Sequence, residues 1–393
     1  MKMSTRLALP LLSIALLVSC QDDPAVAFAK AKESFVQEDY AAASNAATAA
    51  LQGDPGNREI LRLLADSQLR AGDVDRAGFT IDRLERGGLE KAPLARMKAE
   101  LALLRNEPEE AWALVENVSD PAARYARAEA LRLLGRKDEA AAIFEQGLAE
   151  GRDVRLASAY ARMRLLQADT AAVRRIHQRM REFAPTAFAT RVLAGDLADA
   201  EGRTEAAIAA FSGLVRDFPD RVEPMIVLAA LLDQKGRPEA AQALFDKAEA
   251  ISPDDERMLP LRIRLLSGQG KWQEVREALQ GRESALVPAS ALGLSYGEAL
   301  LRLGQAEQAR ILFNRAVLMR PENPYTRMLL GEAQLATGDA EGAWDTLEPL
   351  TEMPDAPPEL FAVAGKAARA VGNPAAARLE ARGRSANEKA SPG

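Results

Sequence analysis

The amino-acid sequence predicts an all-α protein, an α-solenoid of about eleven helix-turn-helix units. Ala and Leu dominate the apolar residues, Glu and Arg are abundant, and aromatic residues make up only 5%, a composition that favours helix over strand. No long β-branched run alternates with polar residues, so no sheet is expected. A phrase in which Gly is followed five residues later by Ala also recurs along the chain, and such a fixed period is typical of solenoids.

The first nineteen residues have the pattern of an export signal. Lys2 and Arg6 form a short positive segment, and residues 7–18 form an almost unbroken apolar run. A run of about a dozen residues is too short to cross a bilayer, which takes ~20 residues, but it fits the apolar part of a signal peptide. We therefore expect residues 1–19 to be a signal peptide.

The sequence Leu17-Val18-Ser19-Cys20 resembles the lipobox of bacterial lipoproteins. The resemblance implies cleavage after Ser19 and lipidation of Cys20, the only Cys of the chain, with residues 20–26 as a lipidated linker. Two or three acyl chains make a stable anchor where one does not. A plain secretory signal with an incidental Cys is the alternative.

Residue 21 is Gln, whereas an Asp directly after the lipidated Cys retains lipoproteins in the inner membrane of enteric bacteria. By this analogy the protein is an outer-membrane lipoprotein that faces the periplasm, and the inner membrane is the less favoured location. The mature chain has 49 basic and 57 acidic residues, because Lys2 and Arg6 leave with the signal. A net charge of −8 argues against a nucleic-acid partner.

The body of the chain repeats three classes of position in one register. The second member of the phrase recurs every 34 residues, with shorter steps of 29 and 33 before and after its fourth occurrence: it falls at Ala43, Ala77, Ala111, Ala140, Val173, Ala207, Ala241, Val275, Ala309, Ala343 and Ala377. Twelve residues before each stands a small side chain, except at Ile263. Twelve residues after, Pro ends the second helix in five units: Pro55, Pro185, Pro219, Pro253 and Pro321.

This register resembles that of the tetratricopeptide repeat (TPR) over residues 27–382. The resemblance implies a right-handed superhelix whose concave groove is lined by the first helix of every unit. Two departures are expected to kink the solenoid: the shortened step around Pro121, and the eighth unit, where Ile263 replaces a small residue and Pro260 lies in the helix. Residues 383–393 are small and polar, so we expect a disordered tail there.

The sequence predicts no catalytic site, metal site or cofactor, and hence no enzyme. Gly293-Leu294-Ser295-Tyr296-Gly297 matches the nucleophile-elbow motif, but that motif needs a strand before it, and the register places it inside a helix. The single His, His177, stands where other units place Phe, so it is interpreted as a packing residue. One Cys and one His cannot build a structural zinc site.

The expected groove carries the candidate binding residues. One position recurs mostly as an acidic residue, and four residues earlier stand basic or aromatic side chains. The candidates are Arg62, Asp66, Arg96, Glu100, Tyr125, Glu129, Arg162, Asp196, Arg264, Glu298, Tyr325 and Glu332. They predict either a groove for an extended peptide or charged polymer, or a solvated face on which pairs such as Arg62–Asp66 and Arg96–Glu100 form along one helix.

The resemblance to outer-membrane TPR lipoproteins implies a scaffold rather than an enzyme. The partners it implies are other envelope proteins or extended peptides, in assembly of a secretion or pilus system, like the lipoprotein pilotins and the Flp pilus TPR lipoproteins, or in cell-envelope maintenance. The alternative is the periplasmic scaffold of exopolysaccharide export. A net charge of −8 would repel an anionic glycan and attract a cationic one.

Overall fold

The structure, a computed structural model, describes residues 23–253, 255–353 and 356–390. In these residues the chain forms 22 α-helices, three short 3-10 helices and no strand. The all-α solenoid predicted from the sequence is therefore confirmed. The signal peptide and Cys20 lie outside the described residues. No helix within the described ranges is both long enough and apolar enough to cross a membrane.

The helices form eleven pairs that follow the predicted register. The first helices of the pairs are α1 (Pro24–Val36), α3 (Arg58–Ala71), α5 (Lys91–Leu104), α7 (Arg124–Leu133), α9 (Val154–Leu166), α11 (Phe188–Ala200), α13 (Val222–Gln234), α15 (Leu259–Gly268), α17 (Ala291–Arg302), α19 (Pro324–Ala336) and α21 (Pro358–Ala370). The second helices are α2 (Tyr40–Gly53), α4 (Val74–Arg86), α6 (Pro108–Val115), α8 (Lys137–Glu150), α10 (Thr170–Phe183), α12 (Thr204–Asp217), α14 (Pro238–Ile251), α16 (Trp272–Leu279), α18 (Ala306–Met319), α20 (Ala340–Thr351) and α22 (Ala376–Ala390).

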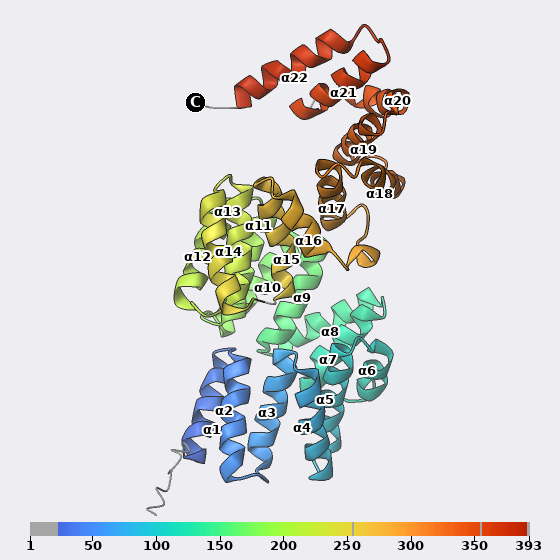
Figure 1. Cartoon of the computed structure of the whole chain (residues 1–393). Helices are drawn as coiled ribbons and strands as arrows, with labels where there is room; N and C mark the ends of the chain where they lie inside the picture. Colours follow the sequence, from blue (N-terminus) through green and yellow to red (C-terminus); the bar gives the residue numbers. More distant parts are fainter. Residues whose placement is uncertain (1–22, 254, 354–355, 391–393) are drawn as a thin grey trace, which may run out of the picture. The chain divides into compact units, whose positions relative to one another are not determined.

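The described part of the chain divides into two compact units, with the boundary between residues 210 and 211. Within each unit, successive helices pack on one another in chain order (Figure 1). The core of each unit is made of the faces that the paired helices turn towards each other. In the first unit it includes Ile81, Leu84 and Phe144, and in the second Phe313 and Leu347, all of them fully buried.

Small side chains allow the two helices of a pair to approach closely. A Cβ atom added at Gly297 would lie 2.6 Å from the ring of Phe313, and one added at Gly331 would lie 2.6 Å from Leu347. These distances are shorter than real side chains tolerate, so the small residue is required by the partner sixteen positions later. Ile263 is the exception, and it is fully buried against Val275 and Leu279.

The turn inside each pair needs a left-handed backbone at one position. Eight of the eleven pairs have Gly there, such as Gly304 with φ of 80°, and the other three have Glu38, Asn106 and Ala168, with φ of 61°, 61° and 55°. In several pairs an Asp directly after this residue caps the next helix, as Asp339 does by accepting a hydrogen bond from the backbone N–H of Gly342. The turn residue and the cap together fix where each second helix begins.

The two departures from the register coincide with shortened helices. In the third pair α6 has only 8 residues, and a 3-10 turn at Pro121–Ala123 precedes α7. In the eighth pair a 3-10 turn at Glu256–Met258 precedes α15, which has 10 residues, and α16 has 8. The remaining 3-10 turn, Glu283–Ala285, leads towards α17. The third and the eighth pair therefore each contain at least one helix shorter than those of the regular pairs.

The expectation of a disordered tail is wrong for residues 383–390, and residues 391–393 lie outside the described residues. The tail expected from Gly383 is helical to Ala390, because the second helix of the last pair has about the length of the others, and Gly383 packs on the backbone of Ala362. Ala377, the last position of the repeat register, is exposed, whereas the other ten are buried. Helix α22 begins at Ala376, four residues after the left-handed Gly372, and Leu379 is buried instead.

Candidate functional site

The first helices of the pairs make one face of each unit, here called the first-helix face, and it carries the candidate binding residues. In the first unit these residues largely pair with one another. Arg96 on α5 donates to Asp66 on α3 at 2.7 Å and to Glu100 on its own helix at 2.9 Å. Arg155 on α9 reaches the second oxygen of Glu100 at 2.7 Å. Side chains from three helices thus close into one ion network.

Glu100 is the centre of this network and is 2% exposed. Burial alone would raise the pKa of Glu100, but the guanidinium groups of Arg155 and Arg96 lower it below its ordinary value. The guanidinium of Arg155 also lies 3.6 Å from the ring centroid of Tyr125 on α7, a cation–π contact. The network therefore binds α3, α5, α7 and α9 to one another.

The remaining candidates of the first unit do not join this network. Glu129 accepts from Arg132 on its own helix at 2.8 Å, and Asp196 is half-buried on α11. Arg62 and Arg162 are exposed, and neither has an ion-pair partner among the described residues. The expected Arg62–Asp66 pair is absent because Asp66 pairs with Arg96, whereas the expected Arg96–Glu100 pair is present.

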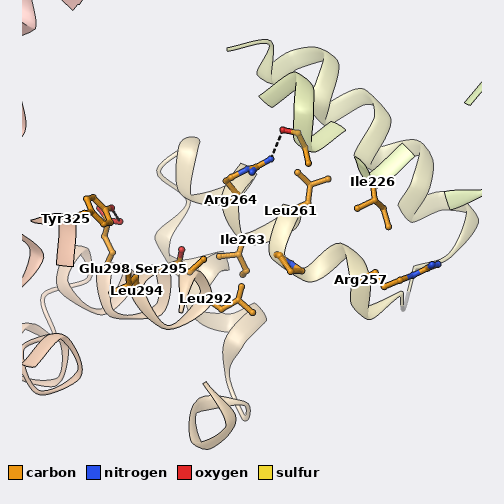
Figure 2. Close-up of a pocket in the computed structure, with 13 residues that line it drawn as sticks. Ile226, Arg257, Leu261, Ile263, Arg264, Leu292, Leu294, Ser295, Glu298 and Tyr325 are labelled. Atoms are coloured by element: carbon orange, nitrogen blue, oxygen red, sulfur yellow. Dashed lines mark hydrogen bonds between the residues drawn. The ribbon is translucent and has the colours of Figure 1, made fainter. Parts of the chain in front are cut away.

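The second unit has a pocket of about 490 Å³ on its first-helix face. Figure 2 shows its lining, which comes from the helices α13, α15, α17 and α19 and from the 3-10 turn before α15. The lining is mostly apolar, with Arg257 and Arg264 towards one side and Glu298 and Tyr325 towards the other. The residues are Ile226, Ala230, Arg257, Pro260, Leu261, Ile263, Arg264, Ala291, Leu292, Leu294, Ser295, Glu298 and Tyr325.

The position of the pocket follows from the irregular eighth pair. A 3-10 turn stands where other pairs begin their first helix, and Pro260 occupies the second position of α15. Ile263 fills the place of a small residue, so this helix cannot pack on its partner as closely as the others do. The shortened helix leaves apolar side chains of α13 and α17, among them Ile226 and Leu292, half-buried and lining the space that remains.

The two charged ends of the pocket differ in their internal pairing. Arg257 is held by Asp255 at 2.6 Å, and Arg264 donates to Asp233 at 2.6 Å and to the carbonyl oxygen of Ala230 at 2.9 Å. Each of these guanidinium groups therefore has a carboxylate of its own.

At the other end, Glu298 accepts a hydrogen bond from the hydroxyl of Tyr325 at 3.0 Å and pairs with Arg302 at 3.1 Å. Arg302 also pairs with Glu332. Two carboxylates therefore share one guanidinium. Burial, with the neighbouring charge of Glu298 second, raises the pKa of Tyr325, so its hydroxyl stays protonated.

The sequence identified charged and polar residues of the pocket but not the apolar residues of its walls. Arg264, Glu298 and Tyr325 were among the candidates, and the structure brings them to one pocket, with Glu332 behind it. Ile226, Leu261 and Leu292 were not, because a 34-residue register cannot tell a core residue from one left uncovered. The available signal was the break in register at Pro260 and Ile263.

Two motifs have the surroundings expected of them. Ser295 of the Gly-x-Ser-x-Gly match lies within α17, with no strand before it. His177 is half-buried on α10, and burial, together with the charge of Arg181, lowers its pKa. Among the described residues, no group of three or more His, Cys, Asp and Glu side chains is placed to hold a metal ion.

Comparison with known families agrees with the register. Tetratricopeptide-repeat models match residues 35–101 and 200–265, and a second model of the same repeat matches residues 294–348. No curated protein matches the chain. Among solved structures, the crystal structure of the APC/C hetero-tetramer Cut9-Hcn1 aligns over 92% of this chain and 96% of that one, with 12% identity and a TM-score of 0.42.

The register, the helix pairs and the exposed first-helix face define a helical-repeat scaffold, a class of protein whose extended surface binds other proteins. The matched segments, residues 35–101, 200–265 and 294–348, are tetratricopeptide repeats.

Proposed function

We propose that this protein is a periplasmic scaffold, tethered to the membrane through Cys20, that holds segments of partner proteins during assembly of an envelope structure such as a secretion or pilus system. The observation that carries the proposal is the pocket on the first-helix face of the second unit. Its volume of about 490 Å³ is that of a typical ligand site, and its lining is mainly apolar. A scaffold of repeats acts through such surfaces and not through reactive groups.

The tether rests on the sequence. The apolar run of residues 7–18 ends at the one Cys of the chain, in the arrangement that the lipobox requires. Helix α1 begins at Pro24, only four residues after Cys20. A lipid attached to Cys20 would therefore hold the first repeat close to the membrane surface, and a Gln at position 21 favours the outer membrane, with the body in the periplasm.

The lining of the pocket favours a protein segment over a polysaccharide. A glycan is bound mainly through hydrogen bonds to its hydroxyl groups, and a pocket walled by Ile226, Leu261, Leu292 and Leu294 offers few partners for them. The same walls gain free energy by covering aliphatic side chains. Export of an exopolysaccharide therefore remains the second choice.

The test is crosslinking in living cells with the full-length protein. A photo-crosslinkable amino acid replaces Ser295 in the pocket, and in a matched control it replaces Asn314, an exposed residue of α18 on the second-helix side. Adducts are purified and identified by mass spectrometry. We expect envelope proteins to crosslink at position 295 and not at position 314. Identical adducts at the two positions, or glycan alone at position 295, would overturn the scaffold proposal.

The tether is tested with Cys20→Ala in the same cells. We expect the wild-type protein to fractionate with membranes and the variant to lose this association, because its acyl chains are absent. Metabolic labelling with a fatty-acid analogue should mark the wild type only. A variant that fractionates and labels like the wild type would remove the lipoprotein part of the proposal and leave the binding part standing.

A further inference from the structure

Resting on the proposed function, we propose that the pocket of the second unit selects a protein segment of aliphatic side chains followed by a Lys or Arg. The aliphatic part would occupy the apolar walls around Leu261 and Leu292. The basic residue would lie against Glu298 and Tyr325. This assigns the partner a chemistry that differs from the charged polymer suggested by the acidic residues in the sequence.

The apolar walls set the first requirement. Side chains from α13, α15 and α17 face the same space, and the pocket is large enough for two or three aliphatic side chains. Because water gains little from contact with such walls, burial of a matching apolar segment provides most of the affinity. A segment of small polar residues would leave the apolar walls in contact with water and would bind weakly.

The arginine side of the pocket does not call for an acidic ligand. Arg257 and Arg264 are the only cations in the lining, and each already has a carboxylate within 2.6 Å. Arg264 also donates a hydrogen bond to the carbonyl oxygen of Ala230, which uses a further N–H group of its guanidinium. A ligand carboxylate arriving there would meet guanidinium groups whose charge is balanced by Asp255 and Asp233.

The opposite side carries unbalanced negative charge. Glu298 and Glu332 share the single guanidinium of Arg302. The ring of Tyr325, 44% exposed, stands beside Glu298 and gives a cation a second favourable contact through its face. A Lys or Arg of the partner would therefore complete the pairing at Glu298, and the order of apolar and basic residues would orient the segment in the pocket.

The experiment uses the mature full-length chain and three labelled peptides in fluorescence anisotropy. The first is acetyl-Gly-Leu-Leu-Val-Lys-Gly-amide, the second has Glu in place of Lys, and the third has Ser in place of the three aliphatic residues. At low salt we expect the first to bind roughly tenfold more tightly than the second, as a charge-assisted contact allows. The third should not bind measurably. At about 0.5 M salt the tenfold ratio should shrink, while binding of the first peptide persists, since salt screens charge and not burial.

Two variants, each with a matched control, locate the binding. Ser295→Trp fills the pocket and should abolish binding, whereas Asn314→Trp on exposed α18 should not. Glu298→Gln keeps an acceptor for Tyr325 and should reduce the preference for Lys over Glu to about twofold or less, as the residual long-range attraction predicts. Glu307→Gln, which removes a carboxylate from an exposed pair with Arg310, should leave the preference unchanged. Circular dichroism confirms that each variant is folded.

The outcomes separate the two proposals. Equal binding of the Lys and Glu peptides, or binding that survives Ser295→Trp, would overturn this inference. If crosslinking in cells still captured envelope proteins at position 295, the scaffold would stand with a partner of different chemistry. If the peptides bound as expected and no partner were captured in cells, the pocket chemistry would stand and the scaffold role would fall.

Discussion

At the scale of single residues, Glu100 shows how a side chain that sequence reasoning placed in a binding groove becomes structural. Its carboxylate lies between the guanidinium groups of Arg96 and Arg155 and is almost completely buried. A ligand would have to break these pairs to reach it. The same acidic position six pairs later, at Glu298 in the second unit, lines a pocket and pairs with one guanidinium, that of Arg302, instead of two.

Glu100→Gln should destabilise the first unit by on the order of 3 kcal/mol at pH 7, the cost of removing one partner of a buried ion pair. The pKa of Glu100 is lowered in the folded protein, so its contribution is present above the pKa of an unfolded Glu, about 4.3, and is lost as the pH falls through the folded value. Urea unfolding of both proteins from pH 7 to pH 3 measures this.

The expected result is a stability difference that is constant near neutral pH and shrinks below about pH 4, because protonated Glu100 resembles Gln. Glu139→Gln, at an exposed pair with Arg136, is the matched control and should have little effect. A difference between wild type and Glu100→Gln that did not depend on pH would show that the network acts through packing and not through charge.

At the scale of elements, the turns between paired helices depend on one left-handed residue. Most pairs use Gly there, which adopts positive φ without strain, whereas Ala168, with φ of 55°, carries a Cβ. Asn106 tolerates this conformation better than Ala does. The turn of the fifth pair is therefore strained at Ala168, and a Gly at this position would remove the strain.

Ala168→Gly should therefore stabilise the protein by about 1 kcal/mol, since a left-handed conformation costs an ordinary residue ~1–2 kcal/mol. Ala142→Gly, at an exposed position in the middle of α8, is the control and should destabilise by about 1 kcal/mol through lost helix propensity. Midpoints of urea unfolding give both values. The same sign for the two substitutions would contradict the assignment of strain to the turn.

At the scale of the whole molecule, each pair of helices packs mainly on its neighbours in the chain within its own unit. Stability in such a protein is approximately a sum of the pairs and their contacts, so damage in one place need not spread to distant pairs. The three Trp residues provide local reporters: Trp112 lies in α6 of the first unit, and Trp272 and Trp344 lie in α16 and α20 of the second.

Glu100→Gln should lower the unfolding midpoint reported by Trp112 and leave that reported by Trp344 nearly unchanged. The measurement uses two backgrounds that each keep one Trp and carry Phe at the other two positions, with fluorescence followed through a urea titration. Equal shifts of the two reporters would mean that all eleven pairs unfold as one cooperative body, contrary to the nearest-neighbour expectation.

The sequence by itself determined the architecture. The 34-residue spacing, the small residues and the turn glycines are local requirements of a helix pair. They recur in most of the pairs, so the register predicted all eleven pairs, including the two irregular ones. It failed in the last helix, α22, which begins two residues later after its turn than most second helices do and continues to Ala390.

Only the tertiary structure decided which candidate residues are available to a partner. Asp66, Arg96 and Glu100 come from neighbouring pairs, and their mutual pairing depends on how Arg155 reaches over α7, which no spacing along one helix reveals. The pocket likewise exists because a short α15 leaves apolar side chains uncovered. Register is fixed by contacts between near neighbours in sequence, whereas exposure depends on contacts between residues 30 or more positions apart.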